Sequence, residues 1–198
     1  MHFEPVSGAY ATHQLLLYNI LTLTTGPVIE FGSGLGSTAL IHKVCQTKHR
    51  KVITLDDNEE WLDRYSDKFG TPWHKFIHVH KSKNEAPDAG THWQKVLMSD
   101  VIKNGGWDLV FIDQSPWIAR YDTLLQFKDN AKYIMVHDCD YFPKHNIFGQ
   151  CDGKGYNFDD VFKCYEVYYP PKPWPSKTGP PTLLGSNMVS ELPKRRIT

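Results

Sequence analysis

The chain has 198 residues, of which 40% are hydrophobic and 22% are charged, and its formal net charge at pH 7 is zero. This length suits one α/β domain with a core of its own, and the composition excludes wholesale disorder. A balanced charge argues against a dedicated nucleic-acid-binding protein, which would carry an excess of Lys and Arg. No apolar stretch approaches the length of a membrane span, so we expect no membrane partner.

The cysteines and the N-terminus bear on the compartment. The four cysteines have no C-x-x-C pair and no zinc-like spacing: Cys45, Cys139, Cys151 and Cys164. We expect free thiols in a reducing environment, with a disulfide as the alternative. The N-terminus lacks the basic segment and apolar run of a secretory signal. The expectation is a cytoplasmic protein, or a domain of a longer one.

Helices and strands are predicted to alternate from the first residues to about residue 136. Apolar residues at helical spacing predict helices over 9–23, 37–46, 58–69, 91–102 and 117–127. Short apolar runs predict strands over 27–31, 51–55, 75–79, 107–112 and 133–136. Strands that alternate with helices over short connections indicate a parallel sheet covered by helices on both faces.

The alternation ends after residue 141. Residues 157–169 predict a short helix that runs into a strand, 170–181 form a proline-rich connection, and 182–186 predict a last strand. These last two strands would add an antiparallel hairpin to the sheet. The predicted fold class is therefore α/β, Rossmann-like and doubly wound, with a mostly parallel sheet and a C-terminal antiparallel hairpin, in one domain over 1–198.

Polar residues and glycines follow four of the predicted strands. They are Gly32, Ser33, Gly34 and Gly36 after the first strand, Asp56 and Asp57 after the second, Asp113 after the fourth, and His137 and Asp138 after the fifth. Ligands of open parallel sheets bind beyond these carboxyl ends. Glycines let backbone N–H groups approach a ligand, and a carboxylate after the second strand can accept hydrogen bonds from both ribose hydroxyls. The pattern therefore predicts a nucleotide-like ligand.

The glycine loop alone fits several nucleotide-binding folds. The dinucleotide fingerprint G-x-G-x-x-G needs a third glycine at position 37, where this chain has Ser37, and there is no G-K-[ST] of a P-loop. An NAD-dependent oxidoreductase would also need a second domain for its substrate. That enzyme class and a non-catalytic nucleotide-binding module are the alternatives to the interpretation below.

Three segments carry a family resemblance. The residues E-F-G-S-G-L-G at 30–36 resemble the first motif of class I S-adenosylmethionine-dependent methyltransferases, V-I-T-L-D-D-N at 52–58 the second, and W-D-L-V-F-I-D at 107–113 the fourth. The resemblance covers about residues 10–140 as a cofactor-binding core, with 141–198 on the substrate side. The segments F-I-D at 111–113 and V-H-D-C-D-Y at 136–141 are similar to small-molecule and sugar O-methyltransferases, some of which hold a divalent metal.

The resemblance implies S-adenosylmethionine as the cofactor. Gly32, Ser33 and Gly34 would form the loop under its methionine part, with Glu30 orienting that loop or receiving the amino group. Asp56 would bind the ribose, or Asp57 if the strand is one residue longer. The third motif has no clear match, and Trp93 could stack on the adenine.

The resemblance also implies a hydroxyl of a small molecule or glycan as the acceptor, most readily a sugar. Asp113 would lie near the methionine amino group, the transferred methyl or a metal. A hydroxyl needs a base or a metal to take its proton, and the imidazole of His137 titrates in the right range for a base. Asp113 with Asp138 could instead bind Mg²⁺ or Mn²⁺. Metal-binding relatives often have Asp-Asp or Asp-Asn after the fifth strand, so His-Asp here favours the base, and we assign no metal ligand.

Every candidate also has a structural alternative. Glu30 could cap a helix or form a salt bridge, Asp56 and Asp57 could cap the helix that starts near residue 58, and Asp113 could begin the next helix. His137 and Asp138 could have purely structural roles.

Two further residues lie within reach of the predicted site. His13 could lie over the cofactor or the acceptor, or could simply be buried. Arg120 could pair with an acidic acceptor, or could belong to a surface network.

Overall fold

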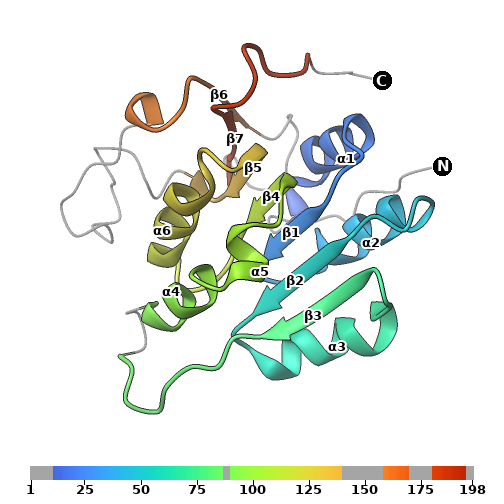
Figure 1. Ribbon diagram of the computed structural model, residues 1–198, viewed down its shortest axis with the longest axis vertical. Coiled ribbons are helices and arrows are strands. Elements are labelled where there is room, and N and C mark those ends of the chain that lie inside the picture. Colours follow the sequence, from blue (N-terminus) through green and yellow to red (C-terminus); the bar gives the residue numbers. More distant parts are fainter. Residues whose placement is uncertain (1–10, 87–89, 140–157, 170–179, 195–198) are drawn as a thin grey trace.

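The computed structural model describes residues 11–86, 90–139, 158–169 and 180–194. These residues contain one seven-stranded sheet with the order β3-β2-β1-β4-β5-β7-β6, shown in Figure 1. The strands are β1 (Val28–Phe31), β2 (Val52–Asp56), β3 (His74–His78), β4 (Trp107–Ile112), β5 (Ala131–His137), β6 (Cys164–Tyr168) and β7 (Thr182–Ser186). Strands β1 to β5 pair in parallel, and β7 pairs antiparallel with both β5 and β6. The predicted fold class, including the antiparallel hairpin, is confirmed.

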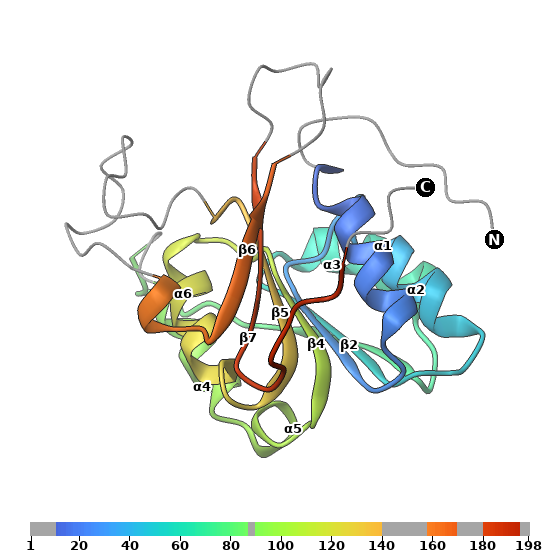
Figure 2. The same ribbon diagram turned by 90° about the horizontal axis from the view of Figure 1, so that it is seen from above.

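Six helices of the described residues cover the two faces of the sheet. They are α1 (Gln14–Leu23), α2 (Thr38–Gln46), α3 (Glu59–Phe69), α4 (Thr91–Leu97), α5 (Asp100–Lys103) and α6 (Ile118–Phe127), and a short 3₁₀ helix, η3, spans Phe158–Asp160. Figure 2 shows α1, α2 and α3 on one face and α4, α5 and α6 on the other. This is the doubly wound arrangement, and it leaves the carboxyl ends of the parallel strands at one edge.

The core has two halves, one on each face of the sheet. Ile29 and Phe31 of β1 pack with Phe127 of α6 on one side, whereas Val28 packs with Leu17 of α1 on the other. Alternate residues of a strand point to opposite faces, so a strand covered on both faces must be apolar throughout. Glu30 is the exception within β1, and it is fully buried.

The structure corrects two of the predicted elements. A single helix over 91–102 is wrong, because α4 ends at Leu97 and α5 begins at Asp100. Between them Ser99 adopts an extended conformation with ψ 139° and serves as the N-cap residue of α5, a position that serine favours. Strand β5 extends to His137, so this histidine is the last residue of a strand and not part of a loop.

Other predictions from the sequence concern the environment of the chain. Within the described ranges, no helix combines the length and the apolar character needed to cross a bilayer. Cys45 and Cys164 are free thiols, whereas Cys151 lies outside the described residues, as does most of the proline-rich connection over 170–181.

Candidate active site

The glycine loop after β1 is held between the ends of β2 and β4. The Gly32 N–H donates to the Leu55 carbonyl (2.8 Å), and the Asp113 N–H donates to the Phe31 carbonyl (2.8 Å). Gly32 has a φ of +88°, and a Cβ at this position would lie 2.6 Å from the Asp113 carbonyl oxygen. Only glycine satisfies both conditions, so the first glycine of the motif is required by the fold itself.

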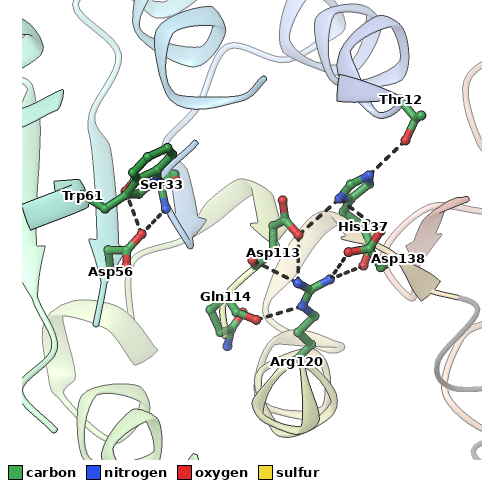
Figure 3. Close-up of polar contacts among 9 residues, drawn as sticks. All are labelled: Thr12, Ser33, Asp56, Trp61, Asp113, Gln114, Arg120, His137 and Asp138. Carbon is green, nitrogen blue, oxygen red and sulfur yellow. Dashed lines mark hydrogen bonds and ion pairs between the residues drawn. The ribbon is translucent and has the colours of Figure 1, made fainter. Parts of the chain in front are cut away.

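Asp56, the last residue of β2, binds the loop from the other side (Figure 3). Its Oδ2 accepts hydrogen bonds from the backbone N–H (2.6 Å) and the hydroxyl (2.7 Å) of Ser33. Its Oδ1 accepts one from the Asn58 N–H (2.9 Å). Burial raises the pKa of Asp56 although these donors lower it. Each carboxylate oxygen can accept two hydrogen bonds, so Oδ1 has capacity for a hydroxyl group of a ligand.

Asp57 has different partners. Its Oδ2 lies 3.0 Å from Nε2 of His92, whose Nδ1 lies 2.7 Å from Oε1 of Glu85. The Asp57 carboxylate therefore links the end of β2 to α4 through His92, while Asp56 binds the glycine loop. Neither carboxylate is the N-cap residue of α3, because Asn58 occupies that position and its side chain accepts the Trp61 N–H (2.9 Å).

Glu30 supports the glycine loop from behind. The hydroxyls of Thr38 and Thr54 donate to its two oxygens, at 3.1 and 2.7 Å. The Thr38 hydroxyl in turn accepts the Gly34 N–H (2.9 Å). Burial raises the pKa of Glu30 to about 8, against the lowering effect of its hydrogen bonds. Of the two predicted roles, these contacts agree with orientation of the loop, because a carboxylate with 0% exposure does not face a ligand.

A second group of polar side chains lies at the ends of β4 and β5, and Arg120 of α6 joins its members (Figure 3). Nη2 of Arg120 lies 3.0 Å from Oδ1 of Asp113, and Nη1 lies 3.1 Å from Oδ2 of Asp138. The same guanidinium donates to the Gln114 and His137 carbonyls, both at 2.8 Å. Of the two alternatives for Arg120, the surface network is wrong, since this residue is buried and its charge is balanced by the carboxylates of Asp113 and Asp138. Asp113 binds Arg120 and does not cap α6.

His137 makes contacts through both ring nitrogens. Nδ1 lies 3.2 Å from Oδ1 of Asp113, and Nε2 lies 2.9 Å from the Thr12 hydroxyl, which donates its own proton to the Pro180 carbonyl (2.7 Å). The Thr12 oxygen must therefore accept, and Nε2 of His137 must carry a proton.

The Asp113–His137 contact changes the titration of both groups. Burial alone would lower the pKa of His137, but the charge of Asp113 and the hydrogen bond to it outweigh burial and raise that pKa. Burial alone would raise the pKa of Asp113, but His137 and Arg120 outweigh it and lower that pKa. Each group therefore favours the charged form of the other.

Asp138 has an unusual backbone conformation. Its φ is +53°, in the left-handed region that aspartate tolerates better than most residues. This conformation accompanies the contact of its carboxylate with Arg120, and it places Oδ1 3.6 Å from Nδ1 of His137. Strained residues at strand ends are common where a site constrains the backbone.

The prediction that Trp93 stacks on adenine is wrong. Trp93 is 1% exposed, packs against Phe31 and donates its indole N–H to the Ser115 carbonyl (2.8 Å). Two residues of the site were not predicted. Thr12 carries no sequence signal, whereas Gln114 could have been found from its position directly after Asp113; its amide oxygen is buried and has no hydrogen-bond partner among the described residues.

Comparisons with known proteins agree with this arrangement at the level of the fold. No family model matches the chain, and no curated protein matches its sequence. One similar solved structure is the bifunctional kinase–methyltransferase WbdD, with a TM-score of 0.51 and 13% sequence identity over 89% of this chain and 38% of that one. A second is human methyltransferase 10 domain containing protein, with a TM-score of 0.54 and 11% identity over 93% of this chain and 84% of that one. A third is the METTL16 MTase domain, with a TM-score of 0.53 and 11% identity over 94% of this chain and 70% of that one. The chain has the Rossmann-like fold of class I methyltransferases. It spans only 38% of the length of WbdD.

Proposed function

We propose that this protein transfers a methyl group from S-adenosylmethionine to an oxygen of a small molecule or glycan, with a sugar hydroxyl as the favoured acceptor. The observation that carries the proposal is the position of β7, antiparallel between β5 and β6. Dinucleotide-binding Rossmann folds instead have the order 3-2-1-4-5-6 in a mostly parallel sheet. The strand order therefore supports methyl transfer over an NAD-dependent oxidoreductase, as does the methyltransferase fold of the structures compared above.

The ends of β1 and β2 fit the cofactor. The loop over 32–36 has a fixed backbone, held by Glu30 through Thr38 and by Asp56 through Ser33. Asp56 would bind the ribose through its remaining acceptor capacity. The cofactor would supply a methyl group bound to a cationic sulfur. The acceptor oxygen would form a bond to the methyl carbon while the carbon–sulfur bond breaks, and the electron pair of that bond would stay on sulfur.

The ends of β4 and β5 fit the acceptor side. The hydroxyl proton must leave as the carbon–oxygen bond forms. Asp113 and His137 are the groups at this edge of the sheet that could promote loss of the hydroxyl proton. His137 could act as a base when its imidazole is neutral, or both residues could be ligands of a cation. The pair Asp113 and Asp138 is a poor site for Mg²⁺, because the Arg120 guanidinium bridges the two carboxylates, at 3.0 and 3.1 Å, where a shared cation would have to lie.

An oxygen acceptor is favoured over a nitrogen acceptor by the sequence after β4. This chain has D-Q-S-P-W at 113–117, and not the N/D-P-P-Y/F motif of many nitrogen methyltransferases. The zero net charge also argues against a nucleic-acid acceptor.

The test is transfer of label from methyl-labelled S-adenosylmethionine to a panel of rhamnose-, xylose- and glucuronate-containing glycans, with RNA and denatured protein in parallel. We expect label in a glycan as an alkali-stable ether. Label in RNA or protein alone would contradict the oxygen acceptor. Cofactor binding without transfer to any acceptor would favour the non-catalytic module.

A further inference from the structure

His13, next to the N-terminus of α1, is buried beside the Asp113–His137 pair. It is 1% exposed, its ring centroid lies 4.5 Å from that of His137, and neither of its nitrogens has a hydrogen-bond partner among the described residues. The Gly36 carbonyl, which accepts the Gln14 amide N–H (2.9 Å), is near enough to raise the pKa of His13, but no hydrogen bond of normal geometry joins it to the His13 ring. Two unsatisfied nitrogens in a buried ring are costly, and such a group in a native site calls for a ligand.

The ligand atoms of His13, Asp113 and His137 converge at one point of the fold. One ligand atom from each of His13, Asp113 and His137 lies within 4.8 Å of the other two. Ligands of a zinc ion lie about 2.0–2.2 Å from the metal, and thus about 3–4 Å from one another. A closure of about 1 Å would bring this set to binding distance.

We propose that His13, Asp113 and His137 form a binding site for a divalent transition-metal ion, for which Zn²⁺ is the reference. Two imidazoles and one carboxylate suit Zn²⁺ and its neighbours in the first transition row, whereas Mg²⁺ prefers oxygen ligands alone. Three protein ligands are typical of catalytic zinc sites, which keep one position open. This set differs from the Asp113–Asp138 pair considered from the sequence, and it includes His13, which is about 100 residues before Asp113 in the chain.

The surroundings of the site orient its ligands. The Thr12 hydroxyl oxygen accepts a hydrogen bond from the Nε2–H of His137, and the Thr12 O–H donates to the Pro180 carbonyl. Nδ1 of His137 therefore faces Asp113. Arg120 contacts Oδ1 of Asp113 and fixes that carboxylate. Partners of this kind set the tautomer and direction of metal-binding groups. The cation would take the place of the proton on Nδ1 of His137, so binding would release a proton.

This inference rests on the proposed function and makes it more specific. A divalent cation held here would lower the pKa of an acceptor hydroxyl. His137 would then be a ligand, and not the general base predicted from the sequence. The charges of Asp113 and Asp138 would balance those of the cation, with Arg120 as the remaining positive group.

The experiment is a calorimetric titration of the EDTA-treated and dialysed 198-residue protein with Zn²⁺, Co²⁺ and Mg²⁺ in buffers of different ionisation enthalpy. We expect one Zn²⁺ or Co²⁺ per chain, release of about one proton, and no competition from millimolar Mg²⁺. His13→Asn and His137→Asn should each weaken Zn²⁺ binding by about 100-fold, and Thr12→Val by about 10-fold. His80→Asn, which changes an exposed histidine, is the matched control and should bind as the unaltered protein does.

Binding that is absent, or that His13→Asn and His137→Asn leave unchanged, would overturn the site. Nitrogen NMR of the unaltered protein avoids variants that fail to fold: two histidine rings should shift on addition of Zn²⁺, and a shift of His42, His49 or His80 alone would contradict the proposal. Binding of S-adenosylhomocysteine in EDTA separates the two hypotheses. Cofactor without metal binding defeats the metal site only, and metal without cofactor binding defeats the proposed function only.

Discussion

The two halves of the carboxyl edge of the sheet are built in different ways. At the ends of β1 and β2, backbone groups of a glycine loop are held by Asp56 and by Glu30 through Thr38. At the ends of β4 and β5, ionised side chains bind one another around Arg120. The first half is a backbone loop held by side chains, and the second is a cluster of charged side chains. In the proposed function the first would bind the cofactor and the second would activate the acceptor, so we call them the cofactor half and the acceptor half.

The two halves also differ in the distance along the chain that their contacts span. Asp56 and Ser33 are 23 residues apart, whereas the Thr12 contacts with His137 and Pro180 span 125 and 168 residues. The hydrogen bonds that Asp56 and Glu30 contribute to the cofactor half therefore lie within one βαβ unit. The acceptor half needs the N-terminus, the middle of the chain and the connection to β7 to meet, so it depends on the complete fold.

The largest effect on stability is expected from Arg120→Met in the acceptor half. Removal of the guanidinium leaves the carboxylates of Asp113 and Asp138 with His137 as their remaining ion-pair partner, and the free energy of unfolding should fall by about 3 kcal/mol in urea at pH 7. Arg64→Met is the control, because the Arg64–Glu60 pair is exposed and should contribute little. Equal effects of the two changes would show that Arg120 does not hold this half together.

Gly32→Ala tests the cofactor half. An alanine at a φ of +88° is strained, and its Cβ would lie 2.6 Å from the Asp113 carbonyl, so stability should fall by about 1–3 kcal/mol. Gly34→Ala is the control, since a Cβ there meets only the Ser37 hydroxyl, at 3.6 Å. Thermal unfolding measures both. A Gly32 variant as stable as the Gly34 variant would contradict the fixed loop.

Asp56→Asn should weaken binding of S-adenosylhomocysteine by about tenfold or more, because a hydrogen bond to a charged acceptor contributes about 1.5–3 kcal/mol. Asp57→Asn removes the adjacent carboxylate, which contacts His92 and not the loop, and should change the affinity much less. Isothermal calorimetry on both variants makes the comparison. The reverse order would move the ribose site to Asp57.

Glu30 makes stability depend on pH. Its pKa is about 8 in the folded chain and 4.5 as a reference for the unfolded chain, so the folded state binds more protons between these values. Its contribution is fully present below pH 4.5 and is lost as pH rises through 8, by up to about 1.4 kcal/mol per pH unit. Glu30→Gln should remove this slope. The check is urea unfolding from pH 5 to 8, in which parallel curves for the two proteins would be the contrary result.

The sequence was informative where local pattern decides the structure. Short apolar runs predicted the five parallel strands, because the interior strands of a sheet covered on both faces are mostly apolar. The positions of Gly32 and Asp56 at the ends of strands predicted that they lie near one another, since the parallel arrangement brings those ends together. The break at Ser99 was missed because serine is acceptable both inside a helix and at its start.

The sequence was uninformative where distant residues meet. Nothing near Arg120 indicates that its guanidinium joins Asp113 to Asp138, and nothing near Thr12 indicates a contact with His137. Trp93 shows the same limit, because an aromatic residue that stacks on a ligand and one that fills the core have the same side chain. His13 was noticed, but its unsatisfied nitrogens depend on packing that only the folded chain defines.

The central claim is that this sheet edge binds S-adenosylmethionine and not a dinucleotide. The most direct measurement is a calorimetric titration of the purified protein with S-adenosylhomocysteine and, separately, with NAD. We predict saturable binding of one S-adenosylhomocysteine per chain and no binding of NAD. Saturable binding of NAD with no response to S-adenosylhomocysteine would contradict the claim.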